Sequence, residues 1–198
     1  LIISFKVFNK GKTVFLSTDK WKLIALSVTN WKITKTIDFK APNMGLFDVS
    51  QDFKKIYLVV DDKHIQVLDF KTLRELAYVK AHTSGINMMK LSPNGNVIAS
   101  CGNDGKVSLF DAETGQKIAY LVKHWDEVHS IVFSSSGKYL FSSSEDNTLK
   151  VWDLETLSLA LELQDVPNSF VMKLHDQTLI LGNVKGEIRT FKVLENVD

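Results

Sequence analysis

The sequence predicts an all-β protein built from repeated four-stranded units. Three observations predict this fold class: a sequence period of 42 residues, short runs of apolar and β-branched residues, and turn sequences rich in Gly, Asn, Asp and Ser between these runs. Short strands at regular spacing with such turns are typical of all-β architectures. Few segments have the period of an amphipathic helix, and the three prolines stand in turns or at unit boundaries.

The period is visible at several independent positions. Steps of 42 residues back from Trp152-Asp153 lead to Phe110-Asp111, then to Leu68-Asp69 and then to Leu26-Ser27. The same step relates His124 to His82 and Asp146 to Asp104. No insertion or deletion interrupts the period across about three units, so a repeat architecture is expected.

Each unit is expected to contain four strands. In the clearest unit these are Val128–Phe133, Tyr139–Ser144, Leu149–Asp153 and Ser158–Leu163. The preceding unit gives Ile86–Leu91, Val97–Cys101, Val107–Asp111 and Lys117–Val122. The connections between strands, such as Asn103-Asp104-Gly105, contain the residues that tight turns between antiparallel strands require.

Composition and charge exclude several classes of protein. The 198 residues are 44% hydrophobic and 24% charged, which are the values of a globular domain rather than of a disordered segment. Lys and Arg number 24 against 23 Asp and Glu, so the net charge does not indicate a strongly basic nucleic-acid binder. No apolar run approaches the ~20 residues of a membrane span, and a single cysteine, Cys101, excludes an intrachain disulfide. We expect an intracellular protein, cytoplasmic or nuclear, without membrane contact.

The best-defined unit runs from His124 to the stretch YLFSSSEDNTLKVWD, which ends at Asp153. This unit resembles the WD40 repeat, as does the unit from His82 to Asp111, and the other three units keep mainly the spacing and the hydrophobic positions. The resemblance implies a β-propeller of about five four-stranded blades. The blades are expected at 1–41, 42–82, 83–123, 124–165 and 166–198, and the last is about three residues shorter.

Five units are fewer than the seven blades that most WD40 propellers have. A ring of blades that stops early leaves sheet edges and apolar faces exposed. We therefore expect part of a seven-bladed propeller, which roughly two blades, or at least a closing strand, upstream of Leu1 complete. Closure of a five-bladed ring and completion of the ring by a partner chain are the alternatives.

The resemblance also implies a structural role for a recurring group of polar residues. A hydrogen-bonded chain is implied for His124, Ser142, Asp146 and Trp152 in one blade, and for His82, Ser100 and Asp104 in the preceding blade, where Phe110 replaces the Trp. Ser, His and Asp together also suggest a catalytic triad. Since a catalytic site would not recur at the blade period, we expect a non-catalytic protein.

No motif indicates a cofactor or a metal ion. The glycine-rich loops that bind phosphates are absent, and the five histidines form neither the His-x-x-x-His nor the His-Glu-x-x-His spacing of zinc sites. Asn103-Asp104-Gly105 lacks the further acidic positions of a calcium loop. The sequence therefore predicts neither cofactor nor metal.

Partner binding is expected on loops, because the strands of a propeller are scaffold. By position in the family, the candidates are Gly85, Asn87 and Asn103 in one blade, Trp125, Glu127, His129 and Glu145 in the next, and Met44 and Asp61 in the blade before. An exposed Trp125 beside these acids would anchor a basic or aromatic segment of a partner. The alternative is that Trp125 packs against the neighbouring blade.

Charge is distributed unevenly along the chain. Residues 1–80 carry 14 basic and 8 acidic side chains, whereas residues 81–198 carry 10 and 15. The leading hypothesis is a non-catalytic scaffold that holds partner proteins in an intracellular multiprotein complex. The alternative is a propeller subunit of an RNA–protein assembly, in ribosome biogenesis or splicing, whose basic N-terminal blades contact RNA.

Overall fold

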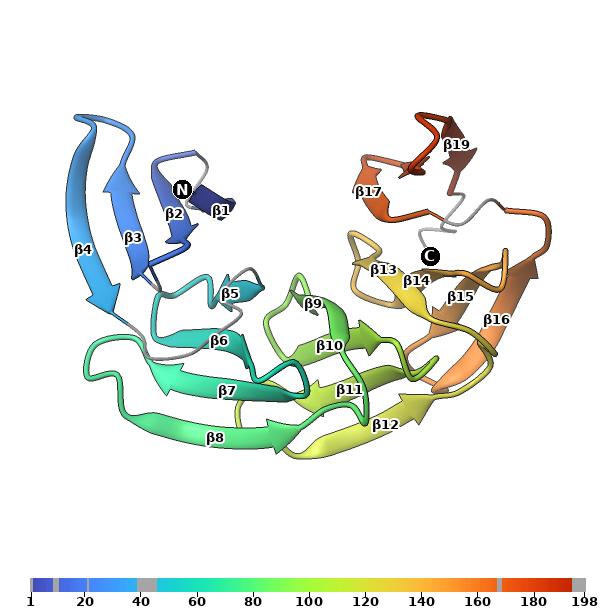
Figure 1. Cartoon of the computed structure of the whole chain (residues 1–198), viewed down its shortest axis with the longest axis horizontal. Helices are drawn as coiled ribbons and strands as arrows, with labels where there is room; N and C mark the ends of the chain where they lie inside the picture. The colour runs from blue at the N-terminus through green and yellow to red at the C-terminus, as the bar shows by residue number, and fades with distance from the viewer. Residues whose placement is uncertain (1, 9–10, 21, 39–45, 167–168, 194–198) are drawn as a thin grey trace. The chain divides into compact units, whose positions relative to one another are not determined.

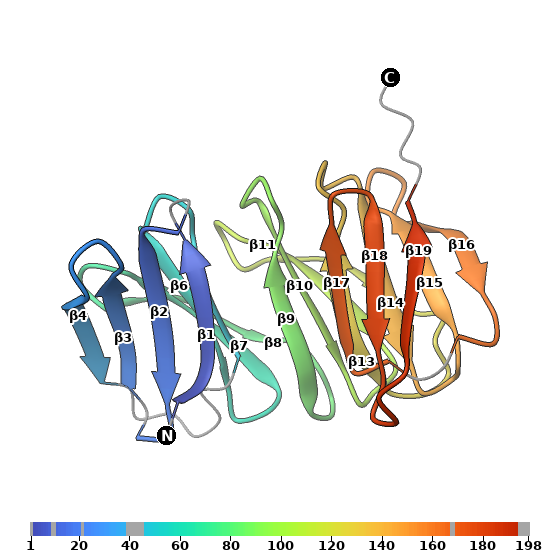
Figure 2. The ribbon, with the colours of Figure 1, turned by 90° about the horizontal axis from the view of Figure 1, so that it is seen from above.

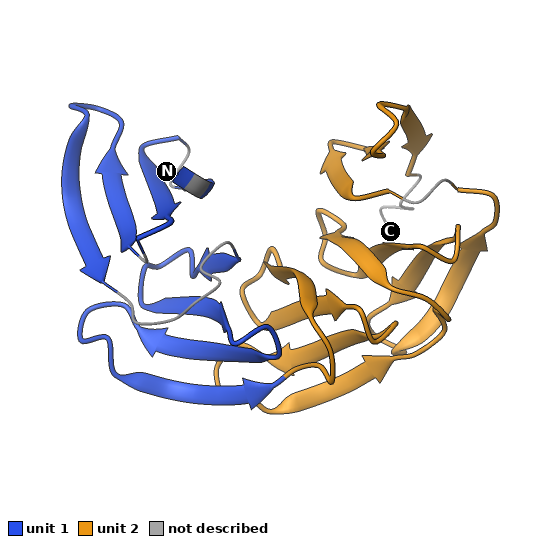
Figure 3. Cartoon of the chain, in the orientation of Figure 1, with its two compact units in different colours: residues 1–80 blue, residues 81–198 orange. Residues whose placement is uncertain are grey.

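A computed structural model describes residues 2–8, 11–20, 22–38, 46–166 and 169–193 of the chain. All regular elements in these residues are β-strands, nineteen of them, so the all-β prediction is confirmed (Figure 1). The chain divides into two compact units, Leu1–Lys80 (unit 1) and Ala81–Asp198 (unit 2) (Figure 3). None of the described residues forms a helix that could span a membrane.

Unit 1 contains two antiparallel sheets of four strands each, with the strands in chain order. The first consists of β1 (Ile2–Phe8), β2 (Thr13–Thr18), β3 (Lys22–Ser27) and β4 (Lys32–Asp38). The second consists of β5 (Phe47–Val49), β6 (Lys55–Val60), β7 (His64–Asp69) and β8 (Glu75–Lys80).

Unit 2 contains three sheets, again with each strand next to its neighbour in sequence. The first consists of β9 (Ile86–Leu91), β10 (Val97–Gly102), β11 (Val107–Asp111) and β12 (Lys117–Leu121). The second consists of β13 (Val128–Phe133), β14 (Tyr139–Ser144), β15 (Leu149–Asp153) and β16 (Ser158–Leu163). The third has three strands in the described residues: β17 (Val171–His175), β18 (Thr178–Gly182) and β19 (Ile188–Lys192).

The spacing of the strands follows the sequence period. β10 begins at Val97 and β14 at Tyr139, which are 42 residues apart, whereas β18 begins 39 residues later, at Thr178. The shortening expected for the last unit is therefore present. The described residues form five sheets, as expected, and a seven-bladed propeller remains a prediction.

The sheet of β13–β16 has a buried apolar face on each side. Leu140 on β14 packs into a core with side chains of β9–β12, such as Leu109. Its neighbour Phe141 packs into a second core with side chains of β17–β19, such as Leu179. Successive side chains of a strand point to opposite faces, so one strand serves two cores. Unit 2 is thus a stack of sheets in which β13–β16 lies between the other two.

In unit 1, only one face of the β1–β4 sheet is covered by the second sheet, through a core that includes Phe15, Leu23 and Phe47. The strand register aligns two apolar rows on the opposite face, Phe5–Leu16–Ile24 and Val7–Val14–Leu26. The side chains of these rows are exposed or only partly buried, with Phe5 65% and Val7 55% exposed. Such a face favours packing against a further sheet.

Candidate functional site

A chain of four hydrogen-bonded side chains runs through the β13–β16 sheet. His124 precedes β13, Ser142 lies on β14, Asp146 in the turn after β14, and Trp152 on β15. The distances are 2.7 Å from His124 Nδ1 to Asp146 Oδ2, 2.7 Å from His124 Nε2 to Ser142 Oγ, and 2.8 Å from Trp152 Nε1 to Ser142 Oγ. All four residues are buried.

The two ends of this chain fix its proton positions. The Trp152 indole can only donate, to Ser142 Oγ, and the ionised Asp146 carboxylate can only accept. The neutral His124 ring therefore donates from Nδ1 to Asp146 and accepts at Nε2 from the Ser142 hydroxyl. The side chains of His124, Ser142 and Trp152 all gain a partner, which matters because an unpaired buried polar group costs about 1–3 kcal/mol.

The chain continues beyond the residues that sequence reasoning selected. The Thr148 hydroxyl donates to Asp146 Oδ1 at 2.6 Å and accepts from Lys150 Nζ at 3.0 Å. Lys150 Nζ lies 2.7 Å from Glu162 Oε2 on β16. Lys150 is 1% exposed, so this ion pair compensates a buried charge. The sequence did contain a signal for Lys150. It lies two residues before Trp152 on β15, and residues two apart on a strand point to the same face.

Burial and hydrogen bonding act in opposite directions on this group. Burial lowers the pKa of His124 below its ordinary value, although the adjacent Asp146 favours the charged ring. Burial alone would raise the pKa of Asp146, but the hydrogen bonds from Thr148 and His124 lower it overall. The pair is therefore a neutral imidazole beside an ionised carboxylate at neutral pH.

This protonation state predicts a loss of stability in mild acid. The unfolded His124 takes up a proton near its ordinary pKa of 6.5, while the folded ring resists until lower pH. Its contribution is complete above pH 6.5 and is lost as the pH falls toward the folded pKa, with a slope of up to about 1.4 kcal/mol per pH unit. Urea denaturation at several pH values between 8 and 5 measures the free energy of unfolding and therefore this loss. His175→Gln, at an exposed side chain, serves as the control, and an unchanged midpoint in wild type across this range would contradict the prediction.

A shorter chain occupies the β9–β12 sheet. His82 Nδ1 lies 2.8 Å from Asp104 Oδ1, and His82 Nε2 lies 2.9 Å from Ser100 Oγ. Phe110 is buried, 1% exposed, where the next sheet has Trp152, so no indole joins this chain. Both Ser100 and Ser142 are 0% exposed. A substrate has no access to these hydroxyls, so the recurring trio does not function as a nucleophile with its base.

The candidate binding residues of the β9–β12 sheet contact one another and the next sheet. Asn87 Nδ2 donates to Asn103 Oδ1 at 2.5 Å and to the Val128 carbonyl at 3.1 Å. A Cβ atom at Gly85 would lie 3.3 Å from Asn103 Nδ2, so the loop passes close to this amide. Asn87 Nδ2 also lies 3.4 Å from His129 Nδ1. Asn87 and Asn103 thus extend the surface around His129.

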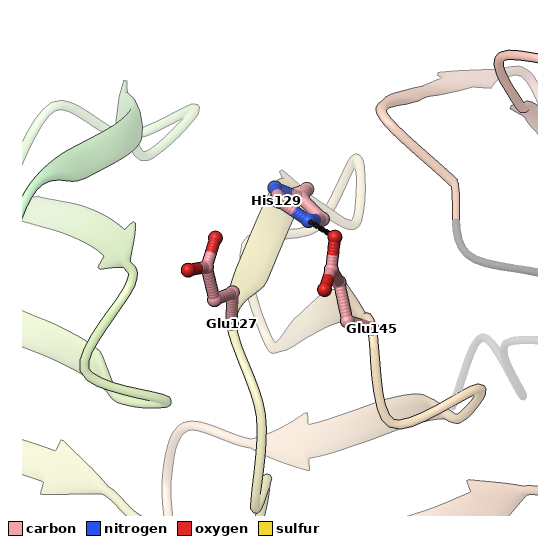
Figure 4. Close-up of side chains that lie close together, drawn as sticks. All are labelled: Glu127, His129 and Glu145. Atoms are coloured by element: carbon pink, nitrogen blue, oxygen red, sulfur yellow. Dashed lines mark hydrogen bonds and ion pairs between the residues drawn. The ribbon is translucent and has the colours of Figure 1, made fainter.

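Three candidates in the next sheet converge (Figure 4). His129 Nε2 lies 3.0 Å from Glu145 Oε1, and potential ligand atoms of Glu127, His129 and Glu145 all lie within 4.8 Å of one another. The His129 ring also stacks on Phe170, with 4.2 Å between the ring centroids. Phe170 was missed by sequence reasoning, because it precedes β17 in a unit with few family residues.

The distances among Glu127, His129 and Glu145 would allow a metal ion, but the hydrogen bonds favour another role. The Asn87 amide nitrogen donates to the Val128 carbonyl and lies 3.4 Å from His129 Nδ1, so the contact suits an unprotonated Nδ1 better than a protonated one. In this tautomer the ring proton lies on Nε2 and is donated to Glu145. A metal ion at Nε2 would require the proton on Nδ1, facing the Asn87 amide protons. The arrangement is better suited to an external cation that binds the two carboxylates.

The remaining candidates are Trp125, Asp61 and Met44. The Trp125 side chain is 75% exposed, which favours contact with a partner over packing against a neighbouring sheet. Asp61 belongs to unit 1, where it accepts from His64 Nδ1 at 2.6 Å and from the Tyr78 hydroxyl at 3.0 Å. Met44 lies outside the described residues.

The sheets and their hydrogen-bonded chains define a class of protein: one built from repeated antiparallel blades that a buried His, Ser and Asp stabilise. Residues 72–111 and 115–153 each match the family model of the WD domain, G-beta repeat. These two matches, together with the repeated antiparallel sheets, support a WD40-repeat propeller. No curated protein sequence matches the chain significantly. The second matched segment contains β12, the last strand of one sheet, and β13–β15, the first three strands of the next. One sequence repeat therefore contributes strands to two neighbouring sheets.

Proposed function

We propose that the protein is a non-catalytic scaffold that binds a basic segment of a partner protein. WD40 propellers are generally protein-interaction scaffolds. The proposed contact is the acidic–aromatic surface of unit 2, which consists of Trp125, Glu127, His129, Glu145 and Phe170. The observation that carries the proposal is the convergence of Glu127 and Glu145 on His129, beside Phe170.

The chemistry of this surface supports a cationic ligand. The two carboxylates are acceptors only, and His129 already uses its Nε2 proton on Glu145. An arginine guanidinium carries five donors in a rigid fork and can serve both carboxylates. Phe170 is 37% exposed and offers apolar contact to the stem of such a side chain. Trp125 adds an exposed ring of the kind that anchors protein interfaces.

The surface is also held in place before a partner binds. Glu145 N donates to the Glu127 carbonyl at 2.9 Å, which ties the turn after β14 to the loop before β13. The His129 side chain is 9% exposed and is fixed by contacts with Asn87, Glu145 and Phe170. Little ordering entropy is lost when a prearranged surface binds.

Binding of synthetic peptides tests this proposal. We expect peptides with arginine next to an aromatic residue to bind the wild-type chain more tightly than the same peptides with glutamine instead of arginine. Glu127→Gln with Glu145→Gln, and separately Trp125→Ala, should each weaken binding about tenfold or more. Isothermal titration calorimetry measures the affinity.

Glu155→Gln is the matched control. Glu155 is an exposed carboxylate in the turn between β15 and β16, at the opposite end of the same sheet. Glu155→Gln changes the net charge by as much as Glu127→Gln or Glu145→Gln does alone. It should leave the affinity for the peptide unchanged. Equal binding of arginine and glutamine peptides, or equal losses in the control, would argue against the proposed surface.

A further inference from the structure

The basic residues of unit 1 gather at one end of its strands. The turn end of unit 1 is formed by the turns β1–β2, β3–β4, β5–β6 and β7–β8 with the strand residues next to them; Figure 2 shows the first two of these turns at the same end of their sheet. Among the described residues, its basic side chains are Lys12, Lys32, Lys54, Lys55, Lys71 and Arg74. Its acidic ones are Asp52, Asp69 and Glu75.

The opposite end of unit 1 is balanced. Its described charged residues are Lys20, Lys22, Lys63 and Lys80 against Asp19, Asp38, Asp61 and Asp62. Midway along the strands, Lys6 and Asp48 form an ion pair at 2.6 Å. The basic residues of the N-terminal half are spread along the sequence. The fold therefore concentrates their excess positive charge at the turn end.

The carboxylates of the turn end are engaged within their own unit. Asp52 accepts from the Ser50 hydroxyl at 2.7 Å and pairs with Lys54 at 3.2 Å. Asp69 accepts from the backbone and the hydroxyl of Thr72, both at 2.6 Å, and Glu75 accepts from a side-chain amide of β7 at 2.8 Å. Lys12, Lys32, Lys71 and Arg74 are exposed and present their charges to solvent.

Four phenylalanines hold the turns of this end together. The rings of Phe8, Phe15, Phe53 and Phe70 form one cluster, with centroids 5.4–6.3 Å apart. Phe53 and Phe70 belong to turns of the second sheet, whereas Phe8 and Phe15 belong to the first. The Lys35 side chain on β4 also reaches the Phe70 carbonyl and lies over its ring. The basic residues are thus carried on a packed platform.

An exposed tryptophan stands at this end. Trp31, in the β3–β4 turn, is 70% exposed and has a φ of 55°. Leu73, Gly115 and Leu157 take the same left-handed conformation in the corresponding turns of three other sheets. The backbone there suits glycine, and a bulky residue in this region is strained. Leucine takes the same conformation in two of these turns, so it is the exposure of the Trp31 indole that makes it available to a ligand.

We propose that the turn end of unit 1 binds a single-stranded nucleic acid. Lys12, Lys32, Lys71 and Arg74 would contact successive phosphates, and a base would stack on Trp31. A basic surface that follows the backbone, combined with an aromatic stacking platform, is how proteins bind single strands without base-specific readout. This inference goes beyond the proposed function and concerns the other unit of the chain. The peptide experiment therefore tests the proposed function, and a separate experiment tests this inference.

Fluorescence anisotropy with a labelled oligouridylate tests the inference. The wild-type chain should bind at low salt, and Trp31→Gly should weaken binding about tenfold, which is the order of one lost base stack. Glycine suits the left-handed backbone, so this variant should keep its fold and its melting temperature. Leu157→Gly is the matched control, because it makes the same backbone change in the corresponding turn of a unit 2 sheet, away from the proposed surface and without removing an aromatic ring.

The dependence of binding on salt gives a second, independent readout. Removal of two cations in Lys71→Ala with Arg74→Ala should reduce the slope of log K against log salt by about 0.7 for each lost phosphate contact. Lys63→Ala, at the balanced end, should leave the slope unchanged. Absence of binding at low salt, no effect of Trp31→Gly, or equal binding of polyglutamate would overturn the inference, the last in favour of an acidic protein partner.

Discussion

His124→Ala is expected to lower the free energy of unfolding of unit 2 by about 4 kcal/mol. The substitution removes a side chain that is hydrogen-bonded at both ring nitrogens and leaves a buried cavity. It also takes one hydrogen bond from the buried Asp146 carboxylate and one from the Ser142 hydroxyl. Urea denaturation followed by circular dichroism measures the loss, which is a large share of the roughly 5–15 kcal/mol typical of a folded domain.

A milder variant separates this network effect from loss of volume. Trp152→Phe reproduces the residue that the chain itself has at Phe110, and it removes only the indole hydrogen bond to Ser142 and part of the ring. We expect it to cost about 1–2 kcal/mol. If His124→Ala cost no more than Trp152→Phe, the hydrogen-bonded chain would not have the structural role assigned to it.

Gly102→Ala is expected to cost about 2–3 kcal/mol, although Gly102 has no positive φ. A Cβ atom at this position would lie 2.4 Å from the Gly85 carbonyl oxygen, a backbone atom that accepts a hydrogen bond from Asn103 N at 2.8 Å. It would also lie 3.1 Å from His82 Nδ1, which binds Asp104. The methyl group must therefore displace the start of β9 or disturb the buried histidine. Thermal and urea denaturation measure the effect.

Gly182→Ala provides the matched control. Gly182 ends β18 as Gly102 ends β10, but a Cβ atom there meets nothing within 4 Å. The substitution should be neutral or should stabilise the protein by up to about 1 kcal/mol, because alanine restricts the unfolded chain. Similar losses for the two variants would mean that the carbonyl of Gly85 does not restrict the end of β10.

The two candidate surfaces differ in charge and lie on different units. The acidic–aromatic surface of unit 2 suits a basic protein segment, and the turn end of unit 1 suits a polyanion. Both are built from loops and strand ends on packed sheets, where contact residues change without altering the core. A scaffold with both surfaces would bring a basic protein and a nucleic acid to one chain, and the peptide and oligonucleotide titrations measure the two contacts separately.

The sequence alone determined the order of the strands and their turns. Alternating apolar residues and turn residues are local signals, and their 42-residue recurrence indicated where the strands of the two clearest units begin. The WD40 resemblance then named the members of the buried chain, such as His124 and Asp146, because each occupies a fixed place in the repeat.

Tertiary structure alone decided which residues of different strands or sheets meet. The stacking of Phe170 on His129 and the pairing of Lys150 with Glu162 depend on contacts between strands, which no local pattern encodes. The same holds for the gathering of Lys12, Lys32, Lys71 and Arg74 at one end of unit 1, because basic residues that are evenly spread in sequence become neighbours only when alternate turns are folded to the same end. Periodicity specifies the conformation of each strand, whereas a site depends on the packing of several strands together.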